Sequence, residues 1–583
     1  MRTMPVKVAL VVLLIIVLAS TWSALAWSPA EGVDAPPSGD GSAPAGEQAL
    51  SSGSQPMWIS GGNPGFYAAR DNRNLDPTEY NLVGGHNSFY WGGGYQALEE
   101  AEGVYNWHII DNFLNEQTAM GKKAAFGIIT FAGRANWGDP IDPPVRVPQY
   151  VFDKGAGKVI CPDSFEIPKF WDATYKAEYE DFITDLAARY DGDPRIEFIQ
   201  IGVGKYGETQ PCDDADNDSV EAALLADGYT QWSWPYIVND ITDIYTRHFS
   251  QTKLLLPNAP RFKNECDRRE FTDHAVAQGV GLFPAGIYPV LEWVDPRTKP
   301  GWSGCGKYDR ILDQAGTDAP WVPVAFEMYH YMTPDSISFF WGVAAGLSRH
   351  ADYITAERDV LYEGEPGDPG PPMYDNIATM GWAKQYMGKH TDDTPSVWVL
   401  LRESGYADNF FPQKGNYNWW LEQEDISGGE TVLATYRTRR ELVRAGDYDY
   451  YGDSCVRTTI ETKQAFLGPS QEGWICRRTT NGGKMYFKID DRYFVGGPSE
   501  ATVTITYLDR GWDSWDLICH DGGGSPISVR TVNKTNTGAW RQEVVYLPNA
   551  WFNNMLSGYD FYIDRKYDGG EEYIHKEDSL IQS

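Results

Sequence analysis

Residues 170–203 read FWDATYKAEYEDFITDLAARYDGDPRIEFIQIGV, and this stretch decides the fold. Its first part, Phe170–Tyr190, has the apolar spacing of an amphipathic helix, and the turn signal DGDP follows at Asp191–Pro194. Its last part, Arg195–Val203, is an apolar run with the length and composition of a buried strand. A helix followed at once by a buried strand is the repeating unit of a parallel α/β fold.

The same alternation extends on both sides of this stretch. The compact apolar run Lys123–Phe131 (KAAFGIITF) predicts another buried strand, and the amphipathic segment Trp107–Met120 before it predicts a helix. The other predicted strands are Met57–Arg70, Asn81–Trp91, Lys253–Pro257, Gly281–Val290, Trp321–Phe326 and Ala351–Thr355, and the other predicted helices are Pro235–His248, Ser336–Leu347 and Asp375–Met387. Eight strands that alternate with helices predict a (β/α)8 barrel.

The sequence changes character after the proline-rich run Pro366–Pro372. Beyond Pro395, Gly-Gly turns and alternating segments such as Ala501–Leu508 and Asp560–Asp564 favour an antiparallel β-sandwich. The predicted organisation is therefore a signal peptide at 1–26, a disordered linker at 27–55, a catalytic barrel at 56–394 and a β-sandwich accessory domain at 395–583.

The N-terminus has the features of a signal peptide. Arg2 and Lys7 flank the start of the apolar run Val8–Leu18, and Ala24–Ala26 is a small-x-small cleavage pattern. An uncleaved membrane anchor is the alternative, because the run is near the lower length limit of a spanning helix. The Pro-, Gly-, Ser- and Ala-rich segment that follows is typical of a tether. We expect the mature chain to be secreted, without membrane contact after cleavage.

Composition narrows the possible partners. The chain has 583 residues, of which 42% are hydrophobic, so it can bury a sizeable core. Its 49 basic and 81 acidic residues give a net charge of −32, which disfavours nucleic acid and anionic lipid as partners. The 22 Trp and 35 Tyr residues suit flat ligands with polar edges, and sugars fit that description.

Seven cysteines lie in a chain predicted to reach an oxidising compartment, where disulfides persist. We predict the pairs Cys161–Cys212, Cys266–Cys305 and Cys455–Cys476, with Cys519 free, and the alternative is that several are buried thiols. No spacing of a zinc finger is present in the sequence.

Two glutamates follow strands four and seven of the predicted barrel. Glu208 lies just past strand four in IGVGKYGETQ, and Glu327 ends strand seven in WVPVAFEMY. Active residues of such barrels lie at the C-terminal ends of the strands. Two acids that face each other there can divide glycoside hydrolysis, one protonating the leaving oxygen and the other attacking the anomeric carbon. The alternative for either residue is an ion pair in a loop.

Residues 91–128, WGGGYQALEEAEGVYNWHIIDNFLNEQTAMGKKAAFGI, resemble the passage from strand two to strand three in clan A retaining glycoside hydrolases, which include the β-galactosidase-like families. The resemblance covers about residues 57–390. It implies that Glu208 is the general acid/base, that Glu327 is the nucleophile and that Tyr288 hydrogen-bonds the nucleophile. The sequence departs from this family at Gly207, where many members have an Asn that holds the sugar 2-hydroxyl.

Further residues are candidates for substrate binding, each with plain packing as the alternative. They are His86, Trp91, Arg134, Trp137, Trp302, Tyr329, His330 and Trp341, together with the carboxylates Asp139, Glu292 and Glu357. The acidic run Asp213–Asp218 lacks the Gly and the distal Glu of an EF-hand loop, so no metal site is predicted.

The predicted β-domain resembles the accessory modules attached to such barrels, and it is rich in aromatics that form either its core or a carbohydrate platform. These are Tyr417, Trp419, Trp420, Trp512, Trp515, Trp540 and Trp551. We expect the domain to dock on the barrel through a buried interface.

The favoured function is a secreted retaining glycoside hydrolase that cleaves a β-linked oligo- or polysaccharide by double displacement, without a cofactor. A non-catalytic carbohydrate-binding protein on a barrel scaffold is the alternative, which the absence of the Asn keeps open. A polysaccharide lyase is disfavoured, because its Tyr, His or Lys base requires neither a barrel nor paired glutamates. The sugar, the endo or exo action and the oligomeric state stay open at this point.

Overall fold

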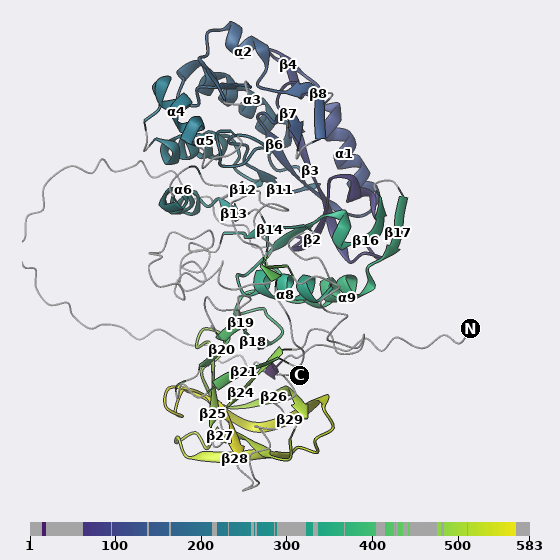
Figure 1. The fold of residues 1–583 in the computed structure, drawn as a ribbon, viewed down its shortest axis with the longest axis vertical. Helices are drawn as coiled ribbons and strands as arrows, with labels where there is room; N and C mark the ends of the chain where they lie inside the picture. The colour runs from purple at the N-terminus through teal and green to yellow at the C-terminus, as the bar shows by residue number, and fades with distance from the viewer. Residues whose placement is uncertain are drawn as a thin grey trace, which may run out of the picture.

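The computed structural model describes residues 14–18 and most of residues 62–566. The longer stretches that it leaves out are 288–321, 404–413 and 435–474, the last interrupted by two short strands. Its upper part in Figure 1 is an α/β barrel, and its lower part consists of antiparallel sheets.

Eight parallel strands form the barrel and follow one another around it in chain order. They are β2 (Gly65–Ala69), β3 (Leu82–Tyr90), β6 (Lys123–Ile129), β11 (Ile196–Gln200), β12 (Lys253–Pro257), β13 (Gly281–Phe283), β14 (Ala325–Met328) and β15 (Tyr353–Ala356). Each strand pairs with the next, β15 pairs with β2, and a parallel bridge from Leu282 to Val324 joins β13 to β14. The barrel is therefore closed, and the predicted fold class is confirmed.

Helices surround this sheet on its outer face (Figure 1). They are α1 (His108–Ala119), α2 (Gln149–Asp153), α3 (Ala173–Tyr190), α4 (Asp218–Ala226), α5 (Trp234–His248), α6 (Glu265–Ala277), α8 (Ser336–Leu347) and α9 (Tyr374–Ala383), with short 3₁₀ turns at Arg70–Asn74 and Arg358–Val360. The longest of them, α3, is capped at its N-terminus by Asp172, whose carboxylate accepts hydrogen bonds from the amides of Thr174 and Tyr175. Its buried face, which includes Phe182 and Leu186, explains the apolar spacing in the sequence.

The loops of the barrel contain pairs of short antiparallel strands. They pair as β4 (Glu99–Ala101) with β5 (Val104–Tyr105), β7 (Gly133–Asn136) with β8 (Asp139–Val145), β9 (Lys158–Ile160) with β10 (Glu166–Pro168), and β16 (Tyr362–Glu365) with β17 (Asp368–Pro372). Among the residues that the structure describes, no helix has both the length and the apolar composition needed to cross a bilayer.

The inside of the barrel is filled by one buried side chain from nearly every strand. This inner layer contains Tyr67, Ala125, Phe198, Leu255, Phe283, Ala325 and Tyr353. Because side chains of a strand alternate between its faces, the residue two positions further along each strand also points inward, nearer the C-terminal end. This register decides which residues reach the barrel mouth.

Strand seven is shifted along the chain from its predicted position. We predicted Trp321–Phe326, whereas β14 is Ala325–Met328. Pro323 has no amide hydrogen to donate to the ladder, which explains why regular pairing begins after it. The shift places Glu327 inside the strand instead of at its end.

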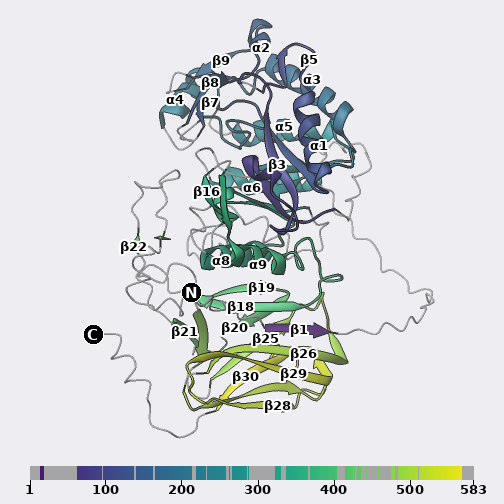
Figure 2. The same cartoon turned by 90° about the vertical axis from the view of Figure 1, so that its right-hand side faces the viewer.

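Two five-stranded antiparallel sheets make up most of the C-terminal part (Figure 2), which confirms that this part is β-rich, whereas the sandwich packing that we predicted stays a prediction. One has the order β19 (Lys414–Trp419), β18 (Val397–Glu403), β1 (Leu14–Leu18), β26 (Gly496–Asp509), β29 (Ala539–Phe552), and the other has β20 (Leu421–Glu424), β25 (Lys484–Ile489), β30 (Phe561–Lys566), β27 (Ser514–His520), β28 (Pro526–Asn533). Shorter pairs are β21 (Glu430–Ala434) with β24 (Ile475–Thr479) and β22 (Glu441–Leu442) with β23 (Val456–Arg457).

The strand β1 comes from the apolar run that we predicted to be the core of a signal peptide. In this structure of the full-length chain it lies between β18 and β26 and pairs antiparallel with both. Cleavage after Ala26 would remove this strand, so the signal peptide and the five-stranded sheet require the same residues.

The β-domain docks on α8 and α9 through buried aromatic side chains, as predicted. The rings of Trp382 in α9 and Trp398 in β18 are 5.6 Å apart, and the ring of His350, just after α8, is 4.3 Å from that of Trp420. Trp398 is fully buried and Trp420 is 5% exposed. One continuous hydrophobic cluster therefore extends from the outer face of the barrel into the β-domain.

Candidate active site

Glu327 faces the inside of the barrel at its C-terminal end. Ala325 belongs to the inner layer and Phe326 to the outer cluster, so Glu327, two residues after Ala325, points inward. The hydroxyl of Tyr329 donates a hydrogen bond of 2.6 Å to Oε2 of Glu327. A tyrosine contact to this carboxylate is thus made by Tyr329, whereas Tyr288, to which the resemblance assigned such a contact, lies outside the described residues and its role stays a prediction.

Glu208 lies in a tight loop after β11 that is tied to the neighbouring strand. The amide of Tyr206 donates to the carbonyl of Phe131, just beyond β6, and Lys205 forms a parallel bridge to the same residue. Gly207 has φ +80°, and a Cβ there would lie 2.6 Å from the carbonyl oxygen of Ile128. This close approach explains why position 207 is a glycine and not the Asn found in many members of the family that the sequence resembles, because an Asn there would clash with the backbone of β6.

The side chain of Glu208 is 8% exposed. Nε2 of Gln210 donates a hydrogen bond of 2.8 Å to its Oε2, and the indole of Trp234 anchors the next residue through the carbonyl of Thr209. Sequence analysis did not identify Gln210, whose proximity to Glu208 depends on the tight loop. The carboxylate is therefore held on a rigid support at the mouth.

Both glutamates belong to the same end of the barrel. Glu208 follows the C-terminal end of β11 and Glu327 lies at that end of β14, with only β12 and β13 between them on one side. Parallel strands in a closed barrel end at one mouth, so the loops after these strands meet there.

Arg70 is a site residue that sequence analysis missed. It directly follows β2 in the left-handed region, with φ 51°, and its Nε lies 3.8 Å from Oε1 of Glu357. Desolvation opposes the charge of Arg70, but Glu357, Tyr329 and Glu327 outweigh it and raise the pKa of this guanidinium. The positive charge of Arg70 therefore lies next to Glu357, and it also interacts electrostatically with the carboxylate of Glu327. Its position at the end of the first predicted strand was the available signal.

His86 lies in the barrel interior below this cluster, with 5% of its surface exposed. Its ring centroid is 6.0 Å from that of Phe198 and 5.8 Å from that of Phe283. Burial and the charge of Arg70 lower its pKa to about 3, against a hydrogen bond with Gln200. His86 is therefore a neutral group that can exchange hydrogen bonds with a hydroxyl.

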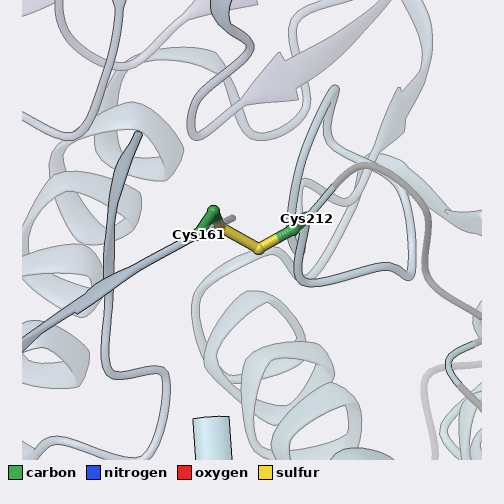
Figure 3. The surroundings of a disulfide bond; sticks show 2 residues. All are labelled: Cys161 and Cys212. Carbon is green, nitrogen blue, oxygen red and sulfur yellow. A yellow bond between two sulfur atoms is a disulfide. The ribbon is translucent and has the colours of Figure 1, made fainter. Parts of the chain in front are cut away.

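A disulfide between Cys161 and Cys212 restrains the loop that carries Glu208 (Figure 3), and this predicted pair is confirmed. Cys212 lies only four positions after Glu208, and its partner belongs to the preceding loop of the barrel. Cys519 is free and buried, as predicted. The pairs Cys266–Cys305 and Cys455–Cys476 involve side chains outside the described part of the chain.

Two aromatic candidates pack in the core, so the prediction that they form subsite walls is wrong. Trp91 is fully buried between β3 and α3, where its Nε1 donates a hydrogen bond of 2.9 Å to Glu99. Trp341 in α8 is 4% exposed, and its ring centroid lies 5.3 Å from that of Tyr417 in the β-domain. Their local sequence did not distinguish an outward-facing barrel position from a loop at the mouth.

Several of the predicted site residues lie outside the part of the chain that the structure describes. They are Trp137, Trp302, His330, Glu292, Asp213–Asn217 and the side chains of Arg134 and Asp139. Within the part of the chain that is described, no group of three or more His, Cys, Asp or Glu residues could hold a metal ion.

No protein-family model and no curated protein sequence matches this chain. Solved structures similar to part of it include the catalytic domain of β-amylase from Paenibacillus polymyxa, with 12% identity and a TM-score of 0.40 over 55% of this chain and 100% of that chain. They also include β-galactosidase from the psychrophilic Marinomonas ef1, with 11% identity and a TM-score of 0.32 over 55% of this chain and 59% of that chain. Similarity at this level says nothing about activity, and the barrel is established by its own strand pairing.

Proposed function

We propose that the protein is a retaining glycoside hydrolase that cleaves a β-linked oligo- or polysaccharide. The observation that carries the proposal is that Glu208 follows strand four and Glu327 lies near the C-terminal end of strand seven, at one mouth of a closed barrel. Paired carboxylates so placed suit an acid and a nucleophile on either side of a glycosidic bond.

In this mechanism, protonated Glu208 gives its proton to the leaving oxygen while Glu327 attacks the anomeric carbon. The glycosyl ester is then hydrolysed by water, whose proton Glu208 takes up. Tyr329 orients Oε2 of Glu327 through its hydrogen bond, and Arg70, which lies next to Glu357, adds a favourable electrostatic interaction with the same carboxylate. His86 offers a neutral polar group near the floor of the site.

Release of reducing ends from a panel of polysaccharides tests the activity, and NMR of the first-formed anomer tests the stereochemistry. Retention is expected. We expect the carboxyl groups of Glu208 and Glu327 to lie about 5 Å apart, as they do in retaining enzymes, and this separation is too short for a water molecule to enter between them. An inverted product would remove the nucleophile role of Glu327.

The substitution Glu327→Gln should abolish turnover without unfolding the protein, since the amide has nearly the same volume but is not a nucleophile. The hydrolysis rate and the circular dichroism spectrum are measured together. Most of the wild-type activity in a folded variant would contradict the assignment.

A carbohydrate-binding protein without turnover is the second candidate, favoured by Gly207 at the position of the family's Asn. It predicts binding to polysaccharide with no reducing-end release from wild-type protein. The same assay on the same panel therefore separates the two functions.

We also propose that the protein is exported and loses its first 26 residues. Intact-mass spectrometry of protein recovered from the medium should show Trp27 as the first residue. A secreted protein that keeps Leu14–Leu18 would instead show that β1 is part of the functional sheet.

A further inference from the structure

The side chain of Gln210 lies beside the carboxylate of Glu208 at the barrel mouth. Nε2 of Gln210 is the donor and Oε2 of Glu208 is the acceptor of their hydrogen bond of 2.8 Å. Gln210 is 2% exposed and Glu208 is 8% exposed. The bond therefore lies in a region of low dielectric, where it is stronger than the same bond in water.

The backbone around Gln210 determines where its amide group lies. The carbonyl oxygen of Gln210 accepts a hydrogen bond of 3.0 Å from the amide of Lys205, and a Cβ on Gly204 would collide with the same oxygen. Cys212, two positions further along the chain, is held by its disulfide to the preceding loop (Figure 3). The fold therefore fixes the position of Gln210 independently of any substrate.

The direction of this hydrogen bond decides which oxygen of Glu208 can carry a proton. An amide nitrogen can only donate, whereas a protonated carboxyl group has one O–H donor and one carbonyl oxygen that accepts. Because Nε2 of Gln210 donates to Oε2, Oε2 is the accepting oxygen, and the proton of the acid form belongs on Oε1. The opposite orientation of the amide would turn its own carbonyl oxygen toward Glu208 and hold the proton on Oε2 instead.

The same hydrogen bond stabilises Glu208 after it has given up its proton. When Oε1 transfers the proton to the glycosidic oxygen, the electron pair of the O–H bond stays on Glu208, and the electron pair of the bond to the anomeric carbon goes to the leaving oxygen. Glu208 becomes a carboxylate, and hydrogen bonds to charged acceptors are about twice as strong as neutral ones. The contact with Gln210 therefore strengthens during the acid step and favours that step.

We propose that Gln210 is a positioning residue for the acid step. Its amide holds the proton of Glu208 on Oε1 and stabilises the carboxylate that forms when this proton leaves. The role in the acid step rests on the proposed function, whereas the orientation of the amide and the place of the proton do not. Gln210 acts through Glu208 and not on the sugar.

NMR of the full-length protein tests the orientation of the amide. Glutamine labelled with ¹⁵N in the side chain shows the two protons of each amide nitrogen, and the signals of Gln210 are assigned by their absence from Gln210→Met. One of these protons should lie downfield, because it is bonded to a carboxyl oxygen, and it should move upfield in Glu208→Ala. Signals of Gln210 that are the same in Glu208→Ala and in the wild type would overturn the proposal.

The kinetics of Gln210→Met test the role in the acid step, since methionine has a similar length and no hydrogen to donate. For aryl glycosides with poor leaving groups, kcat/KM should fall by about 10–100-fold, which corresponds to the loss of one hydrogen bond to a charged group. For 2,4-dinitrophenyl glycosides it should stay unchanged, because their leaving group needs no proton. A purely structural defect would slow both substrate classes alike, and that result would overturn the proposal.

The matched control is Gln117→Met in α1. Gln117 is fully buried, as Gln210 nearly is, but it belongs to a helix outside the barrel sheet. Its two side-chain amide atoms have no hydrogen-bond partner among the residues that the structure describes. The control variant should therefore keep the wild-type kcat/KM for both substrate classes.

Hydrolysis of the same aryl glycosides by wild-type protein separates this inference from the proposed function. If the wild type hydrolyses them and Gln210→Met does so with an unchanged dependence on the leaving group, the inference fails and the proposed function stands. If the wild type hydrolyses none of them although the NMR signals of Gln210 depend on Glu208, the proposed function fails and the assignment of the proton to Oε1 stands.

Discussion

Glu208 and Glu327 are held at the barrel mouth in different ways. Glu327 is part of the strand β14, where its direction follows from the inner layer, whereas Glu208 depends on a loop that glycine alone can form. Gly204 and Gly207 both approach backbone carbonyls so closely that no side chain fits. The loop geometry therefore excludes an Asn at position 207, and if the proposed hydrolysis is correct, a group other than this residue binds the sugar 2-hydroxyl.

The substitution Glu208→Ala should slow hydrolysis of unactivated glycosides by about 10²–10⁴-fold, the range that general acid catalysis contributes. The loss should be smaller for 2,4-dinitrophenyl glycosides, whose leaving group needs no proton. Steady-state rates on both substrate classes measure the difference. The control Glu270→Ala, at an exposed position of α6, should change neither. Equal losses on both classes would show that Glu208 is not the acid.

The two glutamates could be predicted from the sequence, because both follow apolar runs that are visible without the fold. Arg70 and Trp91 could not. Arg70 lies next to Glu357 only because the first strand pairs with the eighth, a contact between the two ends of the barrel sequence. Trp91 comes directly after β3, where a residue of the barrel mouth would also lie. Its indole points away from the barrel interior and packs on α3, and this direction depends on the strand register, which the sequence does not show.

At the level of elements, Asp352 joins the strands β14 and β15 at the N-terminal end of the barrel. Its carboxylate accepts a hydrogen bond of 2.8 Å from the amide of Val324. Burial raises its pKa to about 7, from 3.8 in an exposed carboxyl, although the charge of Lys253 opposes this. Between these two values the folded state binds more protons than the unfolded state, so stability falls as the pH rises from about 4 to 7.

The substitution Asp352→Asn should therefore flatten this part of the pH profile and stabilise the protein at pH 8 by a few kcal/mol at most. The amide oxygen keeps the acceptor for Val324. Urea unfolding at several pH values measures the effect, with the exposed Asp375→Asn as control. A variant profile parallel to that of the wild type would show that Asp352 is not the titrating group.

The disulfide is the element that fixes the loop of Glu208. Replacing Cys161 and Cys212 by Ser opens a link between positions 51 residues apart, and the chain-entropy model puts the loss of stability at about 4 kcal/mol. Because the loop carries Glu208, the proposed general acid, kcat should fall as well. The melting temperature and the kcat of the double variant test this prediction. Wild-type protein whose disulfide has been reduced should show the same losses. Unchanged kcat would show that β6 alone positions Glu208.

For the whole molecule, the interface between barrel and β-domain determines how independent the two parts are. Aromatic pairs such as Trp382–Trp398 and Trp341–Tyr417 join them, and Trp419 donates a buried hydrogen bond of 2.8 Å to Thr394. The β-domain sequence is rich in aromatic residues, and from them we predicted that this domain docks on the barrel. It could not predict which rings meet, because each pair joins residues from separate elements.

We expect a chain that ends after Thr394 to be poorly soluble or markedly less stable. Its α8 and α9 would expose the rings that now contact Trp398, Tyr417 and Trp420, and an apolar patch of this kind promotes aggregation. Solubility, melting temperature and hydrolysis of a soluble substrate are compared with those of the full-length protein.

A matched pair of point variants tests the same interface without truncation. Trp398→Ala removes a fully buried ring and should lower the free energy of unfolding by about 3–5 kcal/mol, whereas Trp512→Ala changes a ring that is 68% exposed and should have little effect. Because both substitutions remove one indole from the β-domain, their difference isolates burial at the interface. A truncated barrel with unchanged melting temperature and activity, together with equal effects of the two variants, would show instead that the β-domain is an independent module.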